Sequence, residues 1–394
     1  MMEFVYRCSE CGREYPIEPD VMLCPHCRQK QQDKRPLRGI LEVEMKGAFS
    51  ESSSIHDVLP VEKTFFPELP VGNTPLWKPQ LLREQLEFPN LLIKDDTTNP
   101  TGSYKDRASW LVAAFARKWG IENITVASTG NAASSMAGIG AAAGLNVTIF
   151  VPETVPKAKL IQALQYGAKV IPVKGSYDQA YQLAMKYNAE KKALNRNTGY
   201  NPLTIEGKKT AAFELCHQIR ETPDYIFVPA GDAVVLSGIL KGFKDLRKLE
   251  WSDKFPKIIA VQAEKSDALT RAFEKGDFGQ PVPSTTIADS ISVDVPANGY
   301  YALRELKNTG GACVRVSDNE ILESQRKLAS TTGLFVEPSA AATLAGLIRM
   351  KNEIPQEAVI VLMATGSGLK DIDAAGKGVV IPEKSIKKLE DIDD

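Results

Sequence analysis

The sequence has no apolar run that approaches the roughly 20 residues of a membrane-spanning helix. It also has little net charge, because 48 lysines and arginines stand against 49 acidic residues. This balance gives no reason to expect a nucleic acid or an anionic membrane surface as the main partner. The first residues lack a basic segment followed by an apolar one, so we expect a cytoplasmic rather than a secreted protein. The remaining composition is that of an ordinary globular protein, and 394 residues are enough for two or three domains.

Cysteine is scarce, and four of the six cysteines lie close together near the N-terminus. They form two Cys-x-x-Cys pairs, Cys8 with Cys11 and Cys24 with Cys27. Four thiolates at this spacing can close tetrahedrally around zinc, and a site with four protein ligands has no open position for catalysis. We therefore predict a structural zinc ribbon at residues 1–30. The alternative is a set of four free cysteines or a redox dithiol.

The mixed, polar stretch at residues 31–60 predicts a linker, which leaves residues 61–394 as the main body. Within the body, short apolar stretches typical of strands alternate with helical stretches of about ten to fifteen residues. Such alternation predicts an α/β fold with a parallel sheet that is covered on both faces. The strands expected from this pattern are Thr125–Ser128, Val147–Val151, Lys169–Val173, Tyr225–Val228, Ile258–Val261 and Val359–Met363.

One stretch places a lysine where a chemical role is plausible. Residues 99–107 begin as a turn, because Pro100 and Gly102 break regular structure, and they continue as a helix. Lys105 then lies just inside the helix N-terminus, where the positive end of the helix dipole favours a neutral amine. A neutral amine can form a Schiff base with a carbonyl cofactor. The alternative is a solvated lysine in the first helical turn.

Two other loops join a predicted strand to a predicted helix. Residues 128–135 contain Gly130 and open a helix of small residues. Residues 228–238 connect the predicted strand Tyr225–Val228 to the helix that follows it. The free N–H groups and the dipole at a helix N-terminus favour anion binding. Each loop is therefore a candidate anion site, and a mere tight turn is the alternative for the first.

The motif Asn-Pro-Thr-Gly-Ser-Tyr-Lys-Asp-Arg around Lys105 resembles the cofactor-lysine motif of threonine synthases and their relatives among the fold-type II pyridoxal-phosphate enzymes. Tyr104 stands where phenylalanine is usual, and further motifs follow in the family's order over residues 65–375. The resemblance implies a two-domain parallel-sheet fold of the tryptophan synthase β-like kind, with a smaller subdomain at about residues 100–200, preceded by the small zinc ribbon. It also implies pyridoxal 5'-phosphate (PLP), an amino-acid substrate and a homodimer.

The resemblance implies roles for individual residues as well. Lys105 would carry PLP and move protons as the catalytic residue. Asn131 would donate a hydrogen bond to the phenolic oxygen of the cofactor, and Thr365 would bond its pyridine nitrogen. The substrate α-carboxylate would be bound by Ser128, Thr129 and Gly130. The loop expected to hold the cofactor phosphate comprises Gly231, Asp232, Ala233, Val234 and Val235, with Val234 where a glycine is common.

Two departures from the family pattern concern the substrate. Threonine synthases often read Asn-Pro-x-Arg-x-x-Glu-Gly-Gln-Lys-Thr, and here Thr204 replaces the arginine that helps to hold the substrate phosphate. A hydroxyl cannot reproduce a bidentate guanidinium, so Lys208 or Lys209 would have to compensate. Residues 289–299 also differ from the usual pattern.

The motifs imply a threonine synthase, which converts O-phosphohomoserine and water to threonine and phosphate. The two departures favour the alternative, a serine or threonine dehydratase or a β-replacement synthase. A non-catalytic, nucleic-acid-binding protein built on the ribbon is disfavoured by the balanced charge and by the intact motif around Lys105.

Overall fold

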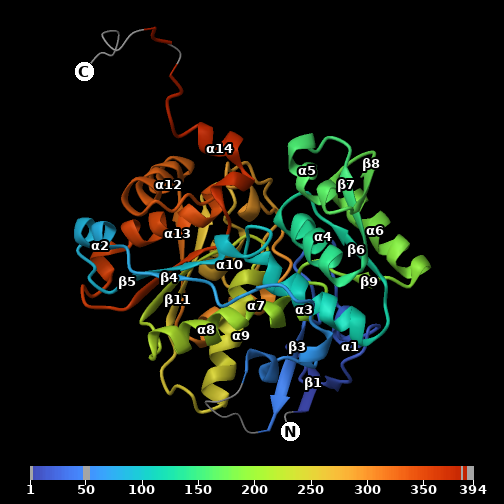
Figure 1. Cartoon of the computed structure of the whole chain (residues 1–394). Helices are drawn as coiled ribbons and strands as arrows, with labels where there is room; N and C mark the ends of the chain where they lie inside the picture. Colours follow the sequence, from blue (N-terminus) through green and yellow to red (C-terminus); the bar gives the residue numbers. More distant parts are fainter. Residues whose placement is uncertain (1–2, 48–53, 383–384, 388–394) are drawn as a thin grey trace.

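The computed structural model describes residues 3–47, 54–382 and 385–387, and parts of the predicted linker and body lie outside these ranges. Its strands form three sheets, of three, four and six strands. Figure 1 shows the unit built on the four-stranded sheet at the right, the unit built on the six-stranded sheet at the left, and the N-terminal sheet below both. No helix within the described residues is long and apolar enough to cross a membrane.

The N-terminal sheet is antiparallel. Its central strand, β1 (Glu3–Cys8), pairs with β2 (Glu14–Tyr15) on one side and with β3 (Leu41–Lys46) on the other. A short helix, α1 (Pro25–Arg28), lies between β2 and β3 in the chain. β3 falls within residues 31–60, the range predicted as a linker. The predicted boundary at residue 30 therefore lies inside this sheet.

The smaller body unit contains an all-parallel sheet with the strand order β8-β7-β6-β9. Every strand and the helices between them lie inside the range of about residues 100–200 expected for a smaller subdomain. The strands are β6 (Asn123–Ala127), β7 (Asn146–Pro152), β8 (Lys169–Val173) and β9 (Leu194–Asn195). The helices are α3 (Lys105–Lys118), α4 (Asn131–Ala143), α5 (Lys157–Gln165) and α6 (Tyr177–Lys191).

The larger unit contains the sheet with the order β12-β11-β10-β13-β5-β4, in which only β4 runs antiparallel to its neighbour. Its strands are β4 (Leu76–Trp77), β5 (Leu91–Asp95), β10 (Tyr225–Pro229), β11 (Lys257–Ala263), β12 (Ala312–Val316) and β13 (Ile360–Ala364). The α-helices are α2 (Gln80–Leu86), α7 (Leu203–Lys208), α8 (Thr210–Ile219), α9 (Val234–Lys248), α10 (Ala268–Lys275), α11 (Gly299–Asn308), α12 (Asp318–Thr332), α13 (Pro338–Arg349) and α14 (Ile372–Gly376). Short 3-10 helices span Ile55–Val58, Lys63–Phe65, Asp96–Thr98, Asp289–Ile291, Lys351–Glu353 and Gly368–Lys370.

Both faces of the six-stranded sheet are covered, which explains why its central strands are apolar at successive positions. In β10, Ile226 and Val228 belong to the core that contains apolar residues of α8 and α9. Phe227, which lies between them in the strand, belongs to the core formed with α12 and α13. The predicted α/β class with a parallel sheet covered on both faces is therefore confirmed.

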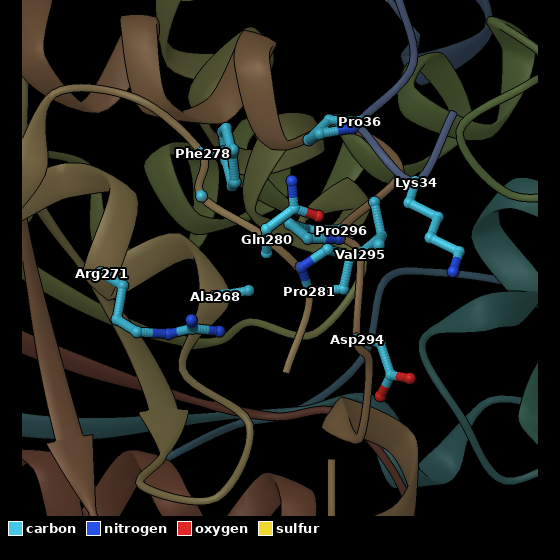
Figure 2. Close-up of a pocket in the computed structure, with 11 residues that line it drawn as sticks. Lys34, Pro36, Ala268, Arg271, Phe278, Gln280, Pro281, Asp294, Val295 and Pro296 are labelled. Carbon is cyan, nitrogen blue, oxygen red and sulfur yellow. The ribbon is translucent and has the colours of Figure 1, made fainter. Parts of the chain in front are cut away.

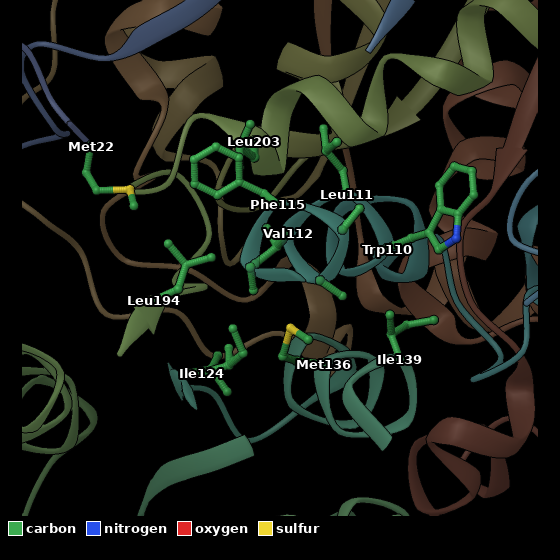
Figure 3. Packing of buried hydrophobic residues seen from close by; sticks show 14 of the residues in the cluster. Met22, Trp110, Leu111, Val112, Phe115, Ile124, Met136, Ile139, Leu194 and Leu203 are labelled. Carbon is green, nitrogen blue, oxygen red and sulfur yellow. The ribbon is translucent and has the colours of Figure 1, made fainter. Parts of the chain in front are cut away.

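Helix α3 lies at the centre of the packing between the units. Every residue from Asp106 to Ala116 is buried. Figure 3 shows Phe115 and Leu111 of α3 between Leu203 of α7 and Met136 of α4. A helix buried on all sides cannot shift without disturbing several neighbours at once. Its first residue, Lys105, is thus fixed in position by the core.

A buried ion network fastens the start of α3 to the larger unit. The guanidinium of Arg107 pairs with Asp96 and with Glu214, each at 2.5 Å, and Lys94 pairs with Glu214 at 2.7 Å. Burial disfavours the charged form of Glu214, but the positive charges of Arg107 and Lys94 outweigh it and lower the pKa of this carboxyl to about 2. Glu214 is therefore ionised throughout the neutral and mildly acidic range.

This network predicts a specific loss of stability in acid. Because the folded pKa of Glu214 lies below its ordinary value of 4.5, its contribution is complete above about pH 4.5 and is lost as the pH falls toward about 2. We expect the wild-type protein to lose about 2 kcal/mol more unfolding free energy than Glu214→Gln between about pH 5 and pH 3. Urea unfolding at both pH values measures this. Equal losses in the two proteins would contradict the prediction.

Candidate active site

The turn before α3 brings Lys105 to the boundary between the two body units. Gly102 in this turn has φ +82°, a left-handed conformation that side chains disfavour. The backbone N–H of Tyr104 donates to the carbonyl of Thr365 at 2.9 Å, so the lysine turn is attached to the segment that follows β13. Lys105 itself is half-buried. The turn therefore brings Lys105 close to Thr365, which is distant in sequence and which the resemblance also assigned to the cofactor site.

A pocket beside Lys105 collects most of the predicted cofactor residues. Lys105, Asn131, Gly231, Asp232, Val235 and Thr365 all line it. The predicted residues Ala233 and Val234 lie between Asp232 and Val235 in the chain and are buried, but they do not line the pocket. The other lining residues are Tyr104, Pro229, Ser290, Ile291, Glu337 and Ser339.

Asn131 is held in this pocket by a buried acid that sequence reasoning did not select as a site residue. The side-chain amide of Asn131 donates to Glu337 at 2.9 Å and to Ser290 at 3.2 Å. Burial raises the pKa of Glu337, against the effects of the Asn131 hydrogen bond and of the nearby charge of Lys105. The available signal was the Glu-Pro pair that begins α13, which equally suits a plain helix start. Glu337 thus fixes the orientation of the predicted cofactor ligand Asn131.

A second cavity, of about 620 Å³, adjoins the first and shares Asn131, Ser290 and Glu337 with it. Thr129 and Gly130, predicted to bind the substrate carboxylate, line this cavity. The third predicted residue, Ser128, accepts a hydrogen bond from the backbone N–H of Gly130 at 3.3 Å, within the same loop. A volume of this size accommodates a small amino acid.

Two lysines bring positive charge to the second cavity. Lys370 donates hydrogen bonds to Ser134 at 2.8 Å and to Gln162, and Lys159 pairs with Asp289 at 2.8 Å. Burial lowers the pKa of Lys370, against the opposing charge of Glu337. The cavity therefore combines a helix N-terminus and two lysines with three carboxylates, those of Asp289, Glu337 and Asp371.

The first helix after β10 begins at the predicted phosphate-binding loop, residues 231–235, which we call the α9 loop. Ala233 has φ +65°, a left-handed conformation, and precedes Val234, the first residue of α9. The carboxylate of Asp232 accepts a hydrogen bond from the backbone N–H of Val234 at 2.9 Å. Burial works against ionisation of Asp232, but the nearby Lys105 and Lys208 lower its pKa below the ordinary value. The chain thus places its own carboxylate at the start of this helix.

Two buried cations face Asp232. The ammonium group of Lys208 has no hydrogen-bond partner among the described residues, although the side chain is fully buried. Burial, together with the positive charges of Lys105 and Arg196, lowers the pKa of Lys208 well below its usual range. Burial also lowers the pKa of Arg196 to about 10, while the charge of Asp232 opposes this shift. An unpartnered buried ammonium is costly unless an anion accompanies it.

Sequence reasoning missed Arg196. Arg196 follows β9, a strand of only two residues that gives no periodic signal in the sequence. The carboxyl end of this parallel strand is directed at the region around Asp232. The guanidinium of Arg196 donates to Thr198 at 2.6 Å and to Ser109 at 3.2 Å. The charge of Asp232 acts on this guanidinium, so Arg196 lies near the α9 loop.

Thr204 is placed differently from what a phosphate ligand requires. Its hydroxyl donates to the carbonyl of Asn201 at 2.7 Å and accepts from the backbone N–H of Gly199 at 3.3 Å. Neither Thr204 nor Lys208 belongs to the lining of the two cavities described above. The hydroxyl of Thr204 is engaged within its own turn.

The four N-terminal cysteines lie together, and their ligand atoms are all within 4.8 Å of one another. The sulfur atoms of Cys8 and Cys27 are 3.8 Å apart, and those of Cys11 and Cys24 are 3.7 Å apart. A tetrahedral zinc site with Zn–S bonds of about 2.3 Å has its sulfur atoms about 3.8 Å from one another. No pair among these cysteines forms a disulfide. The arrangement therefore fits a four-thiolate zinc site.

Comparison with known proteins identifies the family to which these sites belong. The family described as "Pyridoxal-phosphate dependent enzyme" matches residues 67–366. The chain belongs to the pyridoxal-phosphate dependent enzymes. It is similar to the threonine synthase of Methanocaldococcus jannaschii, with 36% identity over 390 residues that cover 94% of this chain and 93% of that protein. It is also similar to the threonine synthase of Bacillus sp. strain ULM1, with 38% identity over 80% of this chain and 89% of that protein.

Solved structures of pyridoxal-phosphate dependent enzymes share the fold. Threonine deaminase isoform 2 from Solanum lycopersicum matches with a TM-score of 0.67 and 22% identity, covering 84% of this chain and 91% of that one. Diaminopropionate ammonia lyase from Escherichia coli matches with a TM-score of 0.68 and 19% identity, covering 78% and 87%. The resemblance to the threonine synthase-like, fold-type II enzymes is thereby confirmed, and the chain is a PLP-dependent enzyme.

The residues around the pocket fit PLP. A half-buried primary amine, that of Lys105, is available for the imine that such enzymes form with the cofactor. The hydroxyl-bearing residue Thr365 lines the same pocket. The unpartnered amine of Lys208 lies near the start of α9, where a phosphate group would supply the anion that favours its charged form.

Proposed function

We propose that this enzyme is a threonine synthase, which converts O-phosphohomoserine and water to threonine and phosphate. The observation that carries the proposal is the placement of Lys105 and Asn131 in a pocket that adjoins a cavity of about 620 Å³, whose lining includes the predicted carboxylate-binding residues Thr129 and Gly130. The similarity to threonine synthases over nearly the whole chain supports the same reaction.

The roles that we propose for the pocket residues follow from their positions. PLP, when bound, withdraws electrons from the substrate carbons next to the amino group. Lys105 then holds and moves the protons at the α and β carbons, since its amine lines the pocket. Asn131, oriented by Glu337, and Thr365 hold the cofactor ring. The Ser128–Thr129–Gly130 loop at the start of α4 binds the substrate carboxylate.

We further propose that Lys208 and Arg196 neutralise the cofactor phosphate at the α9 loop, where Gly231, Asp232, Ala233, Val234 and Val235 surround it. In the protein alone, burial lowers the pKa of Lys208 and favours its neutral amine, whereas a phosphate bound beside Lys208 and Arg196 would supply the anion that favours the charged form. The substrate phosphate would then lie in the second cavity, near Lys370 and Lys159. In this arrangement Lys208 acts on the cofactor rather than on the substrate.

A dehydratase of serine or threonine is the second candidate, and the position of Thr204 favours it. The arginine that helps threonine synthases to hold the substrate phosphate is missing, and the hydroxyl in its place is used within its own turn. A dehydratase needs no phosphate clamp for its substrate.

A product assay separates the two candidates. The PLP-loaded enzyme is incubated in turn with O-phosphohomoserine, L-serine, L-threonine and O-phosphoserine. We expect equimolar release of phosphate and formation of threonine from O-phosphohomoserine alone. Formation of a 2-oxo acid from serine or threonine, with O-phosphohomoserine inert, would instead establish a dehydratase.

We also propose that the four N-terminal cysteines bind one structural Zn²⁺ per chain. The purified full-length chain is expected to contain about one zinc, measured by elemental analysis, and Cys24→Ser is expected to lose most of it. Cys216→Ser is the matched control, because Cys216 lies outside the cluster. Equal zinc contents in the two variants would exclude the site. A homodimer and a cytoplasmic location stay predictions from the sequence.

A further inference from the structure

We propose that the N-terminal ribbon positions the α9 loop, so that metal bound at the four cysteines raises the affinity of the enzyme for PLP. The inference rests on the zinc site proposed above and on PLP as the cofactor, and it is independent of which amino acid is the substrate. Two separate sets of contacts carry it, one apolar and one through backbone hydrogen bonds.

The metal knuckles hold two apolar residues in place, Leu23 of the ribbon and Ile40 of the segment that follows it. Leu23 precedes Cys24 in the chain, and it forms an isolated antiparallel bridge with Ile40. The backbone N–H of Cys24 donates to the carbonyl of Gly39 at 2.8 Å, and the N–H of Ser9 donates to the carbonyl of Ile40 at 2.9 Å. Both knuckles therefore contribute a backbone contact that fixes the side chains of Leu23 and Ile40.

These two side chains lie in the same buried cluster as the first residue of α9. Leu23 and Ile40 share a buried cluster with Val234, Ile205 and Tyr301. Val234 is fully buried there and follows Ala233 in the α9 loop. This contact gives a physical reason for a valine where the family commonly has glycine, because a glycine would offer the ribbon no side chain to pack against.

A chain of backbone hydrogen bonds forms the second connection. The N–H of Leu37, on the ribbon side, donates to the carbonyl of Ala297 at 3.0 Å. The next residue, Asn298, donates its N–H to the carbonyl of Asp232 at 3.0 Å. The carbonyl and the N–H of a single peptide unit therefore carry the contact with the ribbon side and the contact with the α9 loop.

The segment between residues 294 and 299 is itself held by the ribbon side. Figure 2 shows Lys34 and Pro36 beside Val295 and Pro296, with Phe278 packed next to Pro36. The guanidinium of Arg35 donates to the carbonyls of Phe278 and Gly279 from the same side. These contacts fix residues 294–299 between the ribbon and the body, which supports the backbone connection to Asp232.

Loss of the metal is expected to weaken both connections to the α9 loop, the apolar cluster and the chain of backbone hydrogen bonds. A segment of this size is generally too small to hold its fold without a staple such as a metal. Without zinc, Leu23, Gly39 and Ile40 lose the knuckles that fix them, and the α9 loop gains conformational freedom. PLP must then order the loop on binding, which lowers its affinity.

The test measures PLP binding rather than turnover. The full-length enzyme, stripped of PLP, is titrated with PLP in a zinc-loaded and a chelator-treated form, and amide exchange is followed at residues 231–237. We expect chelation to weaken PLP binding by about tenfold or more and to speed exchange in the α9 loop. Exchange in β13 serves as the control for global unfolding. Unchanged PLP affinity and unchanged exchange on chelation would overturn the proposal.

Two substitutions keep the test informative if chelation unfolds the whole chain. Leu23→Ala and Met22→Ala change neighbouring residues that are both 7% exposed, but Met22 packs in the core that contains α3 instead of against Val234. We expect Leu23→Ala to retain its zinc and to weaken PLP binding, and Met22→Ala to leave PLP binding unchanged. In Val234→Gly, chelation is expected to change PLP affinity less than in the wild type. Equal effects of Leu23→Ala and Met22→Ala would rule out the apolar connection.

Discussion

Replacement of Lys105 by alanine is expected to abolish the visible absorption band of lysine-bound PLP and to lower turnover by about 10³-fold or more. Lys105 is the half-buried amine in the pocket that also contains Asn131 and Thr365, and its position is fixed by the buried helix α3. The variant loses both the attachment of the cofactor and the group that moves protons. Absorption spectra after PLP addition and steady-state rates with O-phosphohomoserine measure the two losses separately.

Lys118→Ala is the matched control for this experiment. Lys118 is the last residue of the same helix, and it pairs with Glu62 at the surface. We expect this variant to keep the absorption band and a turnover close to that of the wild type. Because Lys105 lies at the start of α3 and outside its buried stretch, Lys105→Ala should also keep the urea midpoint of the wild type. A Lys105→Ala enzyme that retains the band would show that another lysine carries PLP.

The strands that could be predicted from the sequence are those with apolar residues at successive positions. The predicted strand Tyr225–Val228 is part of β10, which is buried on both faces and therefore has a strong signal. β12 (Ala312–Val316) was missed, because it lies at the edge of the sheet and four of its five residues are only half-buried. β9 has only two residues, too few for any periodic pattern. Pairing of β3 with β1 joins segments more than 30 residues apart, which no local pattern reveals.

The residues of the candidate site also fall into those that the sequence reveals and those that it does not. Lys105, Asn131 and Gly231 each follow a strand and stand at or near a helix start, and this local pattern can be read in the sequence. Arg196 and Glu337 acquire their importance from burial, since an arginine or glutamate at the surface has the same local sequence signal. The contact of Val234 with the ribbon likewise depends on how two distant segments pack. Such features follow from tertiary structure alone.

The neighbouring residues Lys208 and Lys209 allow a second test. Substitution of Lys208 is expected to change the stability of the PLP-free protein and the affinity for PLP in opposite directions. In Lys208→Met, a fully buried and unpartnered ammonium is replaced by an apolar side chain of similar length. We expect the PLP-free protein to keep or gain stability, because an unpartnered buried polar group costs about 1–3 kcal/mol. We expect PLP binding to weaken by about 2 kcal/mol or more, roughly 30-fold, because a buried countercharge of the phosphate is lost. Chemical unfolding without PLP and a fluorescence titration with PLP measure the two effects.

Lys209→Met is the control, since Lys209 is equally buried but has partners. Its ammonium pairs with Glu206 and, at 2.9 Å, with Asp245, so its removal leaves buried carboxylates short of a countercharge. We expect a loss of about 3–5 kcal/mol of unfolding free energy, with PLP affinity of the folded enzyme nearly unchanged. Added PLP should accordingly raise the melting temperature of Lys209→Met as much as that of the wild type, and that of Lys208→Met much less. If Lys208→Met binds PLP as tightly as the wild type, the cofactor phosphate lies elsewhere. Lys208 would then be a buried amine kept neutral by its surroundings, as its lowered pKa allows.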